Sequence, residues 1–147
     1  NELISKDNQF HLFDLSYTEG AFIAKEDIKG SFLLVELSYS IPKFILDREN
    51  FLGGLNEITP YDDIDFSEFT DFSRRFFLGG EDAKSIRSLF NQELVFFFES
   101  HQYYRIESIG NSLLIKRRDR LSSIQEVKSL LAFSNELMSI LNARNNA

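Results

Sequence analysis

The sequence predicts an α+β fold, in which an antiparallel sheet carries two long helices packed on one face. The first half of the chain consists mainly of short apolar runs separated by turn residues, which is the pattern of strands. Two stretches in the second half instead repeat apolar residues at helical spacing. Between these stretches, Gly110 and Asn111 separate two extended segments, residues 103–109 and 112–117, as a hairpin turn does.

Length and composition indicate one soluble domain that spans residues 1–147. Of the 147 residues, 43% are hydrophobic, 14% aromatic and 27% charged, which is the balance of a globular protein. A chain of this length buries roughly two thirds of the surface that its unfolded form exposes, so a single core is sufficient. Because the chain has 16 phenylalanines and no tryptophan, we expect a core rich in phenylalanine.

Four extended segments are expected in the first third of the chain. The strongest are residues 9–17 and 31–39, which are largely apolar and bounded by turn residues. Residues 21–25 and 43–46 are shorter, and the second of these follows a proline that cannot donate to a strand ladder. Asp47 is then a candidate N-cap for a helical turn that stops at two glycines.

Residues 59–71 are expected to form an ordered loop. They combine a proline and five acidic residues with aromatic and aliphatic side chains that are too apolar to remain in water. These apolar side chains are Tyr61, Ile64, Phe66 and Phe69. Residues 72–78 follow as a predicted strand, which ends at Gly79 and Gly80.

The two predicted helices have clear starting signals. Asp82 is the expected N-cap of a helix over residues 83–99. Ser123 and Glu126 have the spacing of a capping box, which opens a last helix that runs to about residue 142. The expected buried stripe of this last helix is Ile124, Val127, Leu131, Met138 and Leu141.

The charge and the residue types exclude several classes of function. The net charge of −7 repels phosphate backbones, so we expect no nucleic-acid partner. The absence of cysteine excludes disulfides, thiol catalysis and zinc sites built on sulfur. No apolar stretch is long enough to span a bilayer, and no signal-peptide pattern is present. We therefore expect any segment that spans a membrane to lie outside this chain.

One cluster of acidic residues is the first candidate for chemistry. Asp62, Asp63, Asp65, Glu68 and Asp71 can converge from a loop and bind a hard cation through oxygen, although their spacing does not match an EF-hand. The alternative is that Asp62 and Asp63 form turn hydrogen bonds and the others face solvent. Arg74 and Arg75, adjacent on the predicted strand, should point to opposite faces, so that one needs a carboxylate partner on the core side.

A basic run and two histidines are the other candidates. Lys116, Arg117, Arg118 and Arg120 can contact a phosphate, an anionic lipid headgroup or an acidic partner, or can simply form a solvated strand end. The two histidines, at positions 11 and 101, are expected to be structural. His11 lies in a predicted strand, and His101 lies just past the end of a predicted helix, where a cation interacts well with the helix dipole. We expect no cofactor.

Several segments carry a resemblance to a known family. They are Phe13-Asp14, Ile41-Pro42-Lys43-Phe44-Ile45-Leu46, Asp63-Ile64-Asp65-Phe66, Phe72-Ser73, Ile86-Arg87, Ile106-Glu107 and Leu113-Leu114-Ile115. Through them the chain resembles uncharacterised bacterial proteins with N-terminal transmembrane segments followed by one soluble domain. The sequence departs from that pattern at Asp47-Arg48, where a proline is expected, and at Phe77, where a tyrosine is expected.

The resemblance implies a place in the cell but no activity. It implies that a membrane anchor preceded Asn1, which fits a first residue other than methionine. It also implies a domain at the bacterial inner membrane, on the cytoplasmic side. The family has no established activity, so no residue role is carried over to this chain.

Three functional hypotheses follow. The first is a non-enzymatic interaction or sensory domain with a protein partner, which requires an apolar groove or patch near residues 59–71. The alternative is a metal-dependent hydrolase that uses Asp62, Asp63 and Asp65 together with Arg74 or Arg75. The third is contact with anionic lipid through residues 116–120. The sequence leaves the oligomeric state open.

Overall fold

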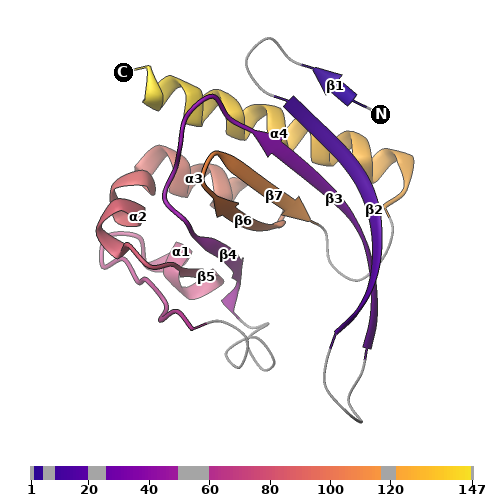
Figure 1. Ribbon diagram of the computed structural model, residues 1–147. Coiled ribbons are helices and arrows are strands. Elements are labelled where there is room, and N and C mark those ends of the chain that lie inside the picture. Colours follow the sequence, from indigo (N-terminus) through magenta and orange to yellow (C-terminus); the bar gives the residue numbers. More distant parts are fainter. Residues whose placement is uncertain (1, 5–8, 20–25, 50–59, 117–121, 147) are drawn as a thin grey trace.

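The computed structural model describes residues 2–4, 9–19, 26–49, 60–116 and 122–146. These form an antiparallel sheet of seven strands in the order β1-β2-β3-β7-β6-β4-β5, together with four helices (Figure 1). The strands are β1 (Glu2–Ile4), β2 (Gln9–Glu19), β3 (Glu26–Glu36), β4 (Ile45–Arg48), β5 (Phe76–Gly79), β6 (Arg105–Ile109) and β7 (Ser112–Lys116). The helices are α1 (Thr70–Arg75), α2 (Ala83–Leu89), α3 (Gln92–Ser100) and α4 (Ile124–Asn145).

The α+β class and the antiparallel sheet are confirmed, but the two long helices are not. Only α4, with 22 residues, is long. The helix expected over residues 83–99 is interrupted at Phe90, and the Asn91 side chain begins a new helix by accepting a hydrogen bond from the Leu94 amide at 3.0 Å. Apolar periodicity continues across this break, so it predicts the buried face but not the local cap.

Helix α4 starts as its sequence predicts. The Ser123 side chain accepts from the Glu126 amide, and the Glu126 carboxylate accepts from the Ser123 amide at 2.8 Å. The buried stripe is shifted from the expected one, because Ile124 is 79% exposed in the first turn. The buried side chains are Leu130, Phe133, Ser134, Leu137, Met138 and Leu141.

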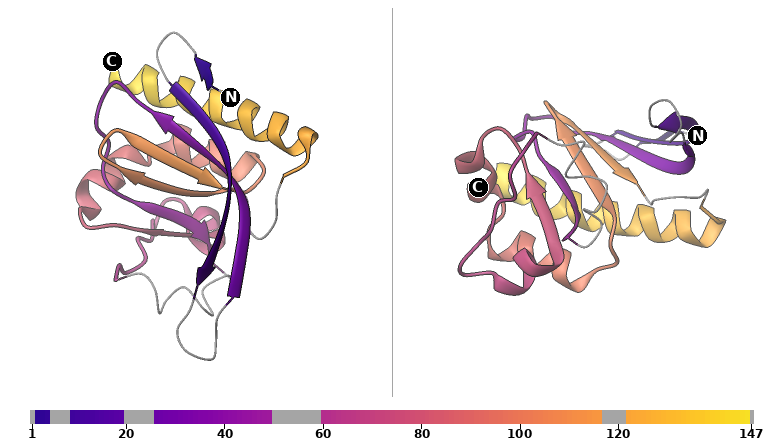
Figure 2. Two further views of the ribbon diagram at one scale, coloured as in Figure 1. Left: turned by 45° about the vertical axis from the view of Figure 1, so that its right-hand side comes forward. Right: turned by 90° about the horizontal axis from the view of Figure 1, so that it is seen from below.

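Helices α3 and α4 lie on the same side of the sheet (Figures 1 and 2). The view from below in Figure 2 shows the strands above α4, with α3 on the same side. Alternate residues of the central strands point toward these helices and are fully buried, as Leu33, Ile106, Leu113 and Ile115 are. The core is rich in phenylalanine, as expected, with ring contacts that join Phe72, Phe76, Phe90, Phe97, Phe98 and Phe133.

The β6–β7 hairpin is confirmed. Its register pairs Ile109 with Ser112, which leaves Gly110 and Asn111 as the two-residue turn. Gly110 has a φ of 62°, a left-handed conformation that costs glycine little. The Asn111 side chain donates to the Leu37 carbonyl at 3.0 Å, so the turn is also tied to the end of β3.

The strand expected over residues 72–78 is wrong in its first half. Residues 70–75 form α1, and β5 begins only at Phe76. Phe72 and Phe76 are four residues apart, so a helical turn buries both rings while Arg74 and Arg75 remain on the outside. The preceding loop is ordered against the core, as expected, with Ile64 and Phe66 buried.

Two further expectations concern the middle of the chain. Asp47 does not cap a helix, because it lies within β4 and is 1% exposed. The helical turn expected over residues 47–55 is wrong at its start, because β4 extends to Arg48, and its residues 50–55 lie outside the described residues. The short strand expected over residues 21–25 also lies outside them. No helix among the described residues is long and apolar enough to cross a membrane.

Candidate functional site

The sheet face opposite α4 carries the candidate site. Strand register places Leu34 beside Leu114, Leu114 beside Glu107, and Glu107 beside Ile45. Because side chains alternate across a strand, this row faces away from the helices that cover Leu33 and Leu113. No helix covers this row in the part of the chain that the structure describes (Figure 2). We call this side of the sheet the open face.

A hollow of about 470 Å³ lies in the open face. Its floor is apolar and comes from three strands, with Leu34, Ile45 and Leu114 partly buried. Ile109, which is 66% exposed, and Tyr61 from the loop before α1 add apolar wall. The volume lies within the range of about 300–1,000 Å³ that is typical of small-molecule sites.

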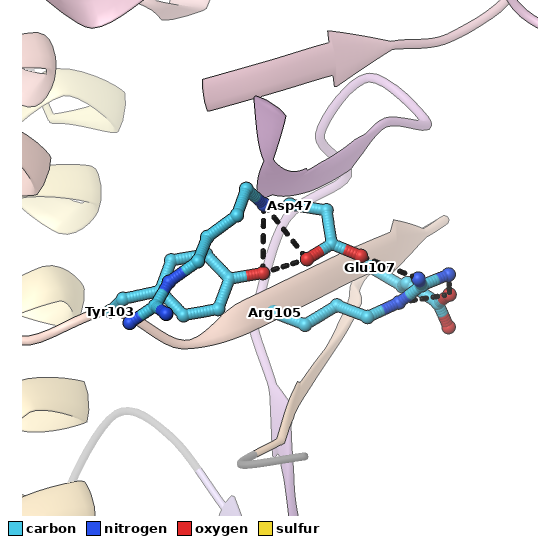
Figure 3. A network of polar contacts seen from close by, with 5 residues as sticks. Asp47, Tyr103, Arg105 and Glu107 are labelled. Atoms are coloured by element: carbon cyan, nitrogen blue, oxygen red, sulfur yellow. Dashed lines mark hydrogen bonds and ion pairs between the residues drawn. The ribbon is translucent and has the colours of Figure 1, made fainter. Parts of the chain in front are cut away.

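A network of polar side chains adjoins the hollow (Figure 3). Arg105 Nη1 donates to Asp47 Oδ2 at 2.7 Å, and Arg105 Nη2 donates to Glu107 Oε1 at 2.5 Å. The Tyr103 hydroxyl donates to Asp47 Oδ1, to which the Arg48 amide also donates at 2.8 Å. We call Asp47, Tyr103, Arg105 and Glu107 the Asp47–Glu107 network.

Two charged side chains of this network, Asp47 and Arg105, are buried. Asp47 is 1% exposed and Arg105 is 8% exposed. Burial lowers the pKa of Arg105, but the carboxylates of Glu107 and Asp47 outweigh it, so the pKa is raised above its ordinary value. One guanidinium therefore serves two carboxylates, and the network carries a net charge of about −1 when both are ionised.

The rim of the hollow holds a second, exposed ion pair. Lys43 Nζ lies 3.4 Å from Glu81 Oε1, which also accepts a hydrogen bond from the Tyr61 hydroxyl at 3.1 Å. Tyr61 and Glu81 together raise the pKa of Lys43. A side chain at Gly80 would place its Cβ 2.3 Å from the Lys43 carbonyl oxygen, so only glycine allows this close approach.

Only some side chains of the predicted acidic cluster lie close to one another. Asp62 is exposed, whereas Asp63 is half-buried and accepts a hydrogen bond from the Leu78 amide at 2.9 Å. Burial raises the pKa of Glu49 to about 7, and Asp63 and Asp65 add to the effect. Burial likewise raises the pKa of Asp63, which shares a hydrogen bond with Glu49.

These acidic groups do not form a metal-binding arrangement within the described ranges. Across residues 2–4, 9–19, 26–49, 60–116 and 122–146, no three His, Asp or Glu side chains are placed to hold a metal ion. The metal site of Asp62, Asp63 and Asp65, and the hydrolase hypothesis built on it, stay predictions. The two arginines expected to act with these carboxylates have other partners. Arg74 pairs with Asp71 at 2.7 Å, and Arg75 donates to the Glu99 carbonyl at 3.2 Å.

The basic run is described only at its first residue. Lys116 is partly buried on the open face, with Nζ 5.5 Å from the centre of the Phe32 ring. Arg117, Arg118 and Arg120 lie outside the described residues. Contact of this run with an anion, a lipid or a partner stays a prediction.

Both histidines have local partners. The ring of His101 stacks on Phe97, with 4.2 Å between the ring centres, and its Nε2 lies 2.5 Å from Glu136 Oε2 on α4. Its Nδ1 lies 2.8 Å from the Phe97 carbonyl oxygen. His11 Nε2 lies 3.9 Å from Glu36 Oε2. His101 thus joins α3 to α4.

The sequence interpretation missed the Asp47–Glu107 network. The local pattern predicts a helix cap at Asp47 and does not indicate a contact among Asp47, Arg105 and Glu107. A signal was present, because Arg105 and Glu107 alternate with Ile106 and Ser108 and so mark one polar face of a strand. The partner strand, however, contributes Asp47 from 58 residues away.

Comparison with known proteins yields no relative for this chain. No protein-family model matches it, and neither a curated protein nor a solved structure is similar enough to count as a match.

Proposed function

We propose that this chain is a non-enzymatic interaction or sensory domain whose binding element is the hollow in the open face. The observation that carries the proposal is the apolar floor of Leu34, Ile45 and Leu114, left partly open beside Tyr61. The interaction hypothesis required such an apolar site next to residues 59–71, and Tyr61 belongs to that segment.

The polar groups around the hollow support binding over catalysis. Arg105 is held by two carboxylates, and Lys43 is held by Glu81 and Tyr61, so these cations are engaged in ion pairs within the protein. Such groups orient a ligand but do not supply a nucleophile with an adjacent base. A sensory domain needs only to bind its ligand more tightly in one conformation than in another. An apolar hollow with a few polar groups is sufficient for such binding.

Attachment to the bacterial inner membrane is part of the same proposal. It is supported by the family resemblance alone. The test is fractionation of cells that express the full gene product. Recovery with the inner membrane supports attachment, and recovery entirely in the soluble fraction contradicts it.

The binding role can be tested with a neutral probe. Titration of the isotope-labelled chain with 4-phenylbutanol, followed by two-dimensional amide NMR, should shift the signals of Leu34, Ile45 and Leu114. The variant Ser112→Phe introduces a ring at the wall of the hollow and should abolish these shifts, because Ser112 lines it. Ser139→Phe, on an exposed part of α4, is the matched control and should leave the shifts unchanged. Saturable shifts confined to other regions, or none, would contradict the proposed site.

A further inference from the structure

Of the described side chains that line the hollow, Glu107 and Lys43 are charged at neutral pH. Lys43 pairs with Glu81, so that pair is neutral. Arg105 instead serves both Asp47 and Glu107, so the Asp47–Glu107 network has an excess of one negative charge when both carboxylates are ionised. That excess acts beside an apolar floor, where charges are screened less than in water.

Glu107 brings this excess to the hollow itself. Both hydrogen bonds that Arg105 donates to Glu107 end on Oε1, one from Nε at 3.1 Å and one from Nη2 at 2.5 Å. Among the described residues, no donor is within hydrogen-bond distance of Oε2. The side chain is 34% exposed, and Glu107 lies between Leu114 and Ile45 in the row that floors the hollow. A ligand cation therefore has a carboxylate oxygen to bind.

The cations near the hollow are less able to bind an anion. Lys43 is directed to Glu81 and Tyr61, and these two groups raise its pKa. Arg105 is 8% exposed and donates to two carboxylates. Lys116 lies two residues after Leu114 on β7, and its ammonium group lies over the Phe32 ring. A carboxylate ligand would have to compete with these internal partners and with the excess negative charge.

We infer that the hollow selects small cationic amphiphiles, in which an apolar body fills the floor of Leu34, Ile45 and Leu114 and a primary ammonium binds Glu107 Oε2. This inference rests on the proposed binding function and names its ligand class. The size of the hollow, about 470 Å³, suits a free small molecule. The net charge of −7 favours the approach of a cation to any part of the chain.

The test compares three probes that share one apolar body. 4-Phenylbutylamine, 4-phenylbutanol and 4-phenylbutyrate are titrated into the 147-residue chain at pH 7 and low salt, and their dissociation constants are measured by amide NMR. We expect the amine to bind about tenfold more tightly than the alcohol, which corresponds to about 1.4 kcal/mol, and the acid to bind most weakly. Raising the salt concentration should narrow the difference between amine and alcohol.

Two variants assign the selectivity to particular groups. Glu107→Gln should lower the affinity for the amine to that for the alcohol, while the affinity for the alcohol stays unchanged and so reports an intact hollow. Glu81→Gln is on an exposed side chain and releases Lys43, so it should strengthen binding of the acid. Glu93→Gln, on an exposed part of α3, is the control and should alter none of the three affinities.

The outcomes separate this inference from the proposed function. If the alcohol or the acid binds as tightly as the amine, the cationic selectivity is wrong and the binding function stands. If Glu107→Gln leaves the amine preference intact, Glu107 is not the contact and the inference is overturned. If no probe binds in the hollow, the proposed function fails and this inference fails with it.

Discussion

The two faces of the sheet differ in the kind of side chain that they bury. The face toward α4 buries apolar groups, among which Leu33, Ile106, Leu113 and Ile115 are fully buried, and a polar group buried with them, Ser108, is uncharged. The open face buries charges, with Asp47 at 1% exposure, and leaves leucine and isoleucine side chains partly in water. Neighbouring residues of one strand, such as Leu113 and Leu114, therefore experience different environments.

This difference separates the face that contributes most to stability from the face for which we propose a binding role. A fully buried apolar face contributes to folding in proportion to the surface removed from water. A partly exposed apolar floor contributes less to folding, because less of its surface is removed from water. The ion network also contributes less, because a buried ion pair loses much of its attraction to desolvation. A face that is poorly optimised for folding is typical of a surface used for binding.

The sharpest test of this comparison uses adjacent leucines on β7. Leu113→Ala should destabilise the fold by about 3–5 kcal/mol, because it leaves a cavity in a packed core. Leu114→Ala should lower the stability by less than half as much, since the side chain is only partly buried. Urea denaturation followed by circular dichroism measures both values. Equal losses would mean that the open face is packed as tightly as the helical face.

The second test breaks the buried ion pair of the open face. Asp47→Asn should destabilise the fold by about 3 kcal/mol, because Arg105 loses the partner at 2.7 Å while it remains buried. The control is Asp71→Asn, which removes an equally short ion pair whose side chains are more than 70% exposed and should cost less than about 1 kcal/mol. If the two variants lose the same stability, burial of the network has no energetic consequence.

A smaller effect is expected at the start of the helix that covers the opposite face. Ser123→Ala should lower stability by about 1 kcal/mol, because the Glu126 amide loses its capping acceptor. For a chain of this size that corresponds to a fall in Tm of roughly 2–4 °C. Ser122→Ala is the neighbouring control and should change Tm little, and a similar fall in both variants would argue against the capping box.

A further expected effect is a pH dependence of stability that involves Glu49 and Asp63. The pKa of Glu49 is raised from 4.5 to about 7 in the folded chain, so the folded state holds a proton that the unfolded state releases. Stability should therefore fall as the pH rises from about 4.5 to about 7, and level off above that. The raised pKa of Asp63 acts in the same direction.

Thermal denaturation between pH 4.5 and 8 checks this dependence. Glu49→Gln removes the titrating group, so its Tm should fall less across that range and should exceed the wild-type Tm at pH 8. The control is Asp62→Asn, an exposed carboxylate whose loss should leave the slope unchanged. An unchanged slope in Glu49→Gln would show that the dependence arises elsewhere.

Local signals in the sequence predicted most of the fold. The capping box at Ser123, the Gly110 turn and the apolar runs of β2 and β3 each depend on neighbouring residues, and each is confirmed. The same local reasoning failed at Asn91, whose side chain caps a new helix although the apolar residues continue at helical spacing across the break. It also failed for residues 70–75, where helical and extended spacing both explain the buried rings.

The candidate site depended on contacts that no local pattern contains. Asp47, Arg105 and Glu107 meet because β4 pairs with β6, and the hollow exists because β3, β4 and β7 lie in one sheet with Tyr61 beside them. The sequence by itself determined the α+β class, the antiparallel sheet and the phenylalanine-rich core, since these follow from composition and periodicity. Only the tertiary structure decided which face stays open and which charges become buried, because strand order and side-chain burial arise from pairing between distant segments.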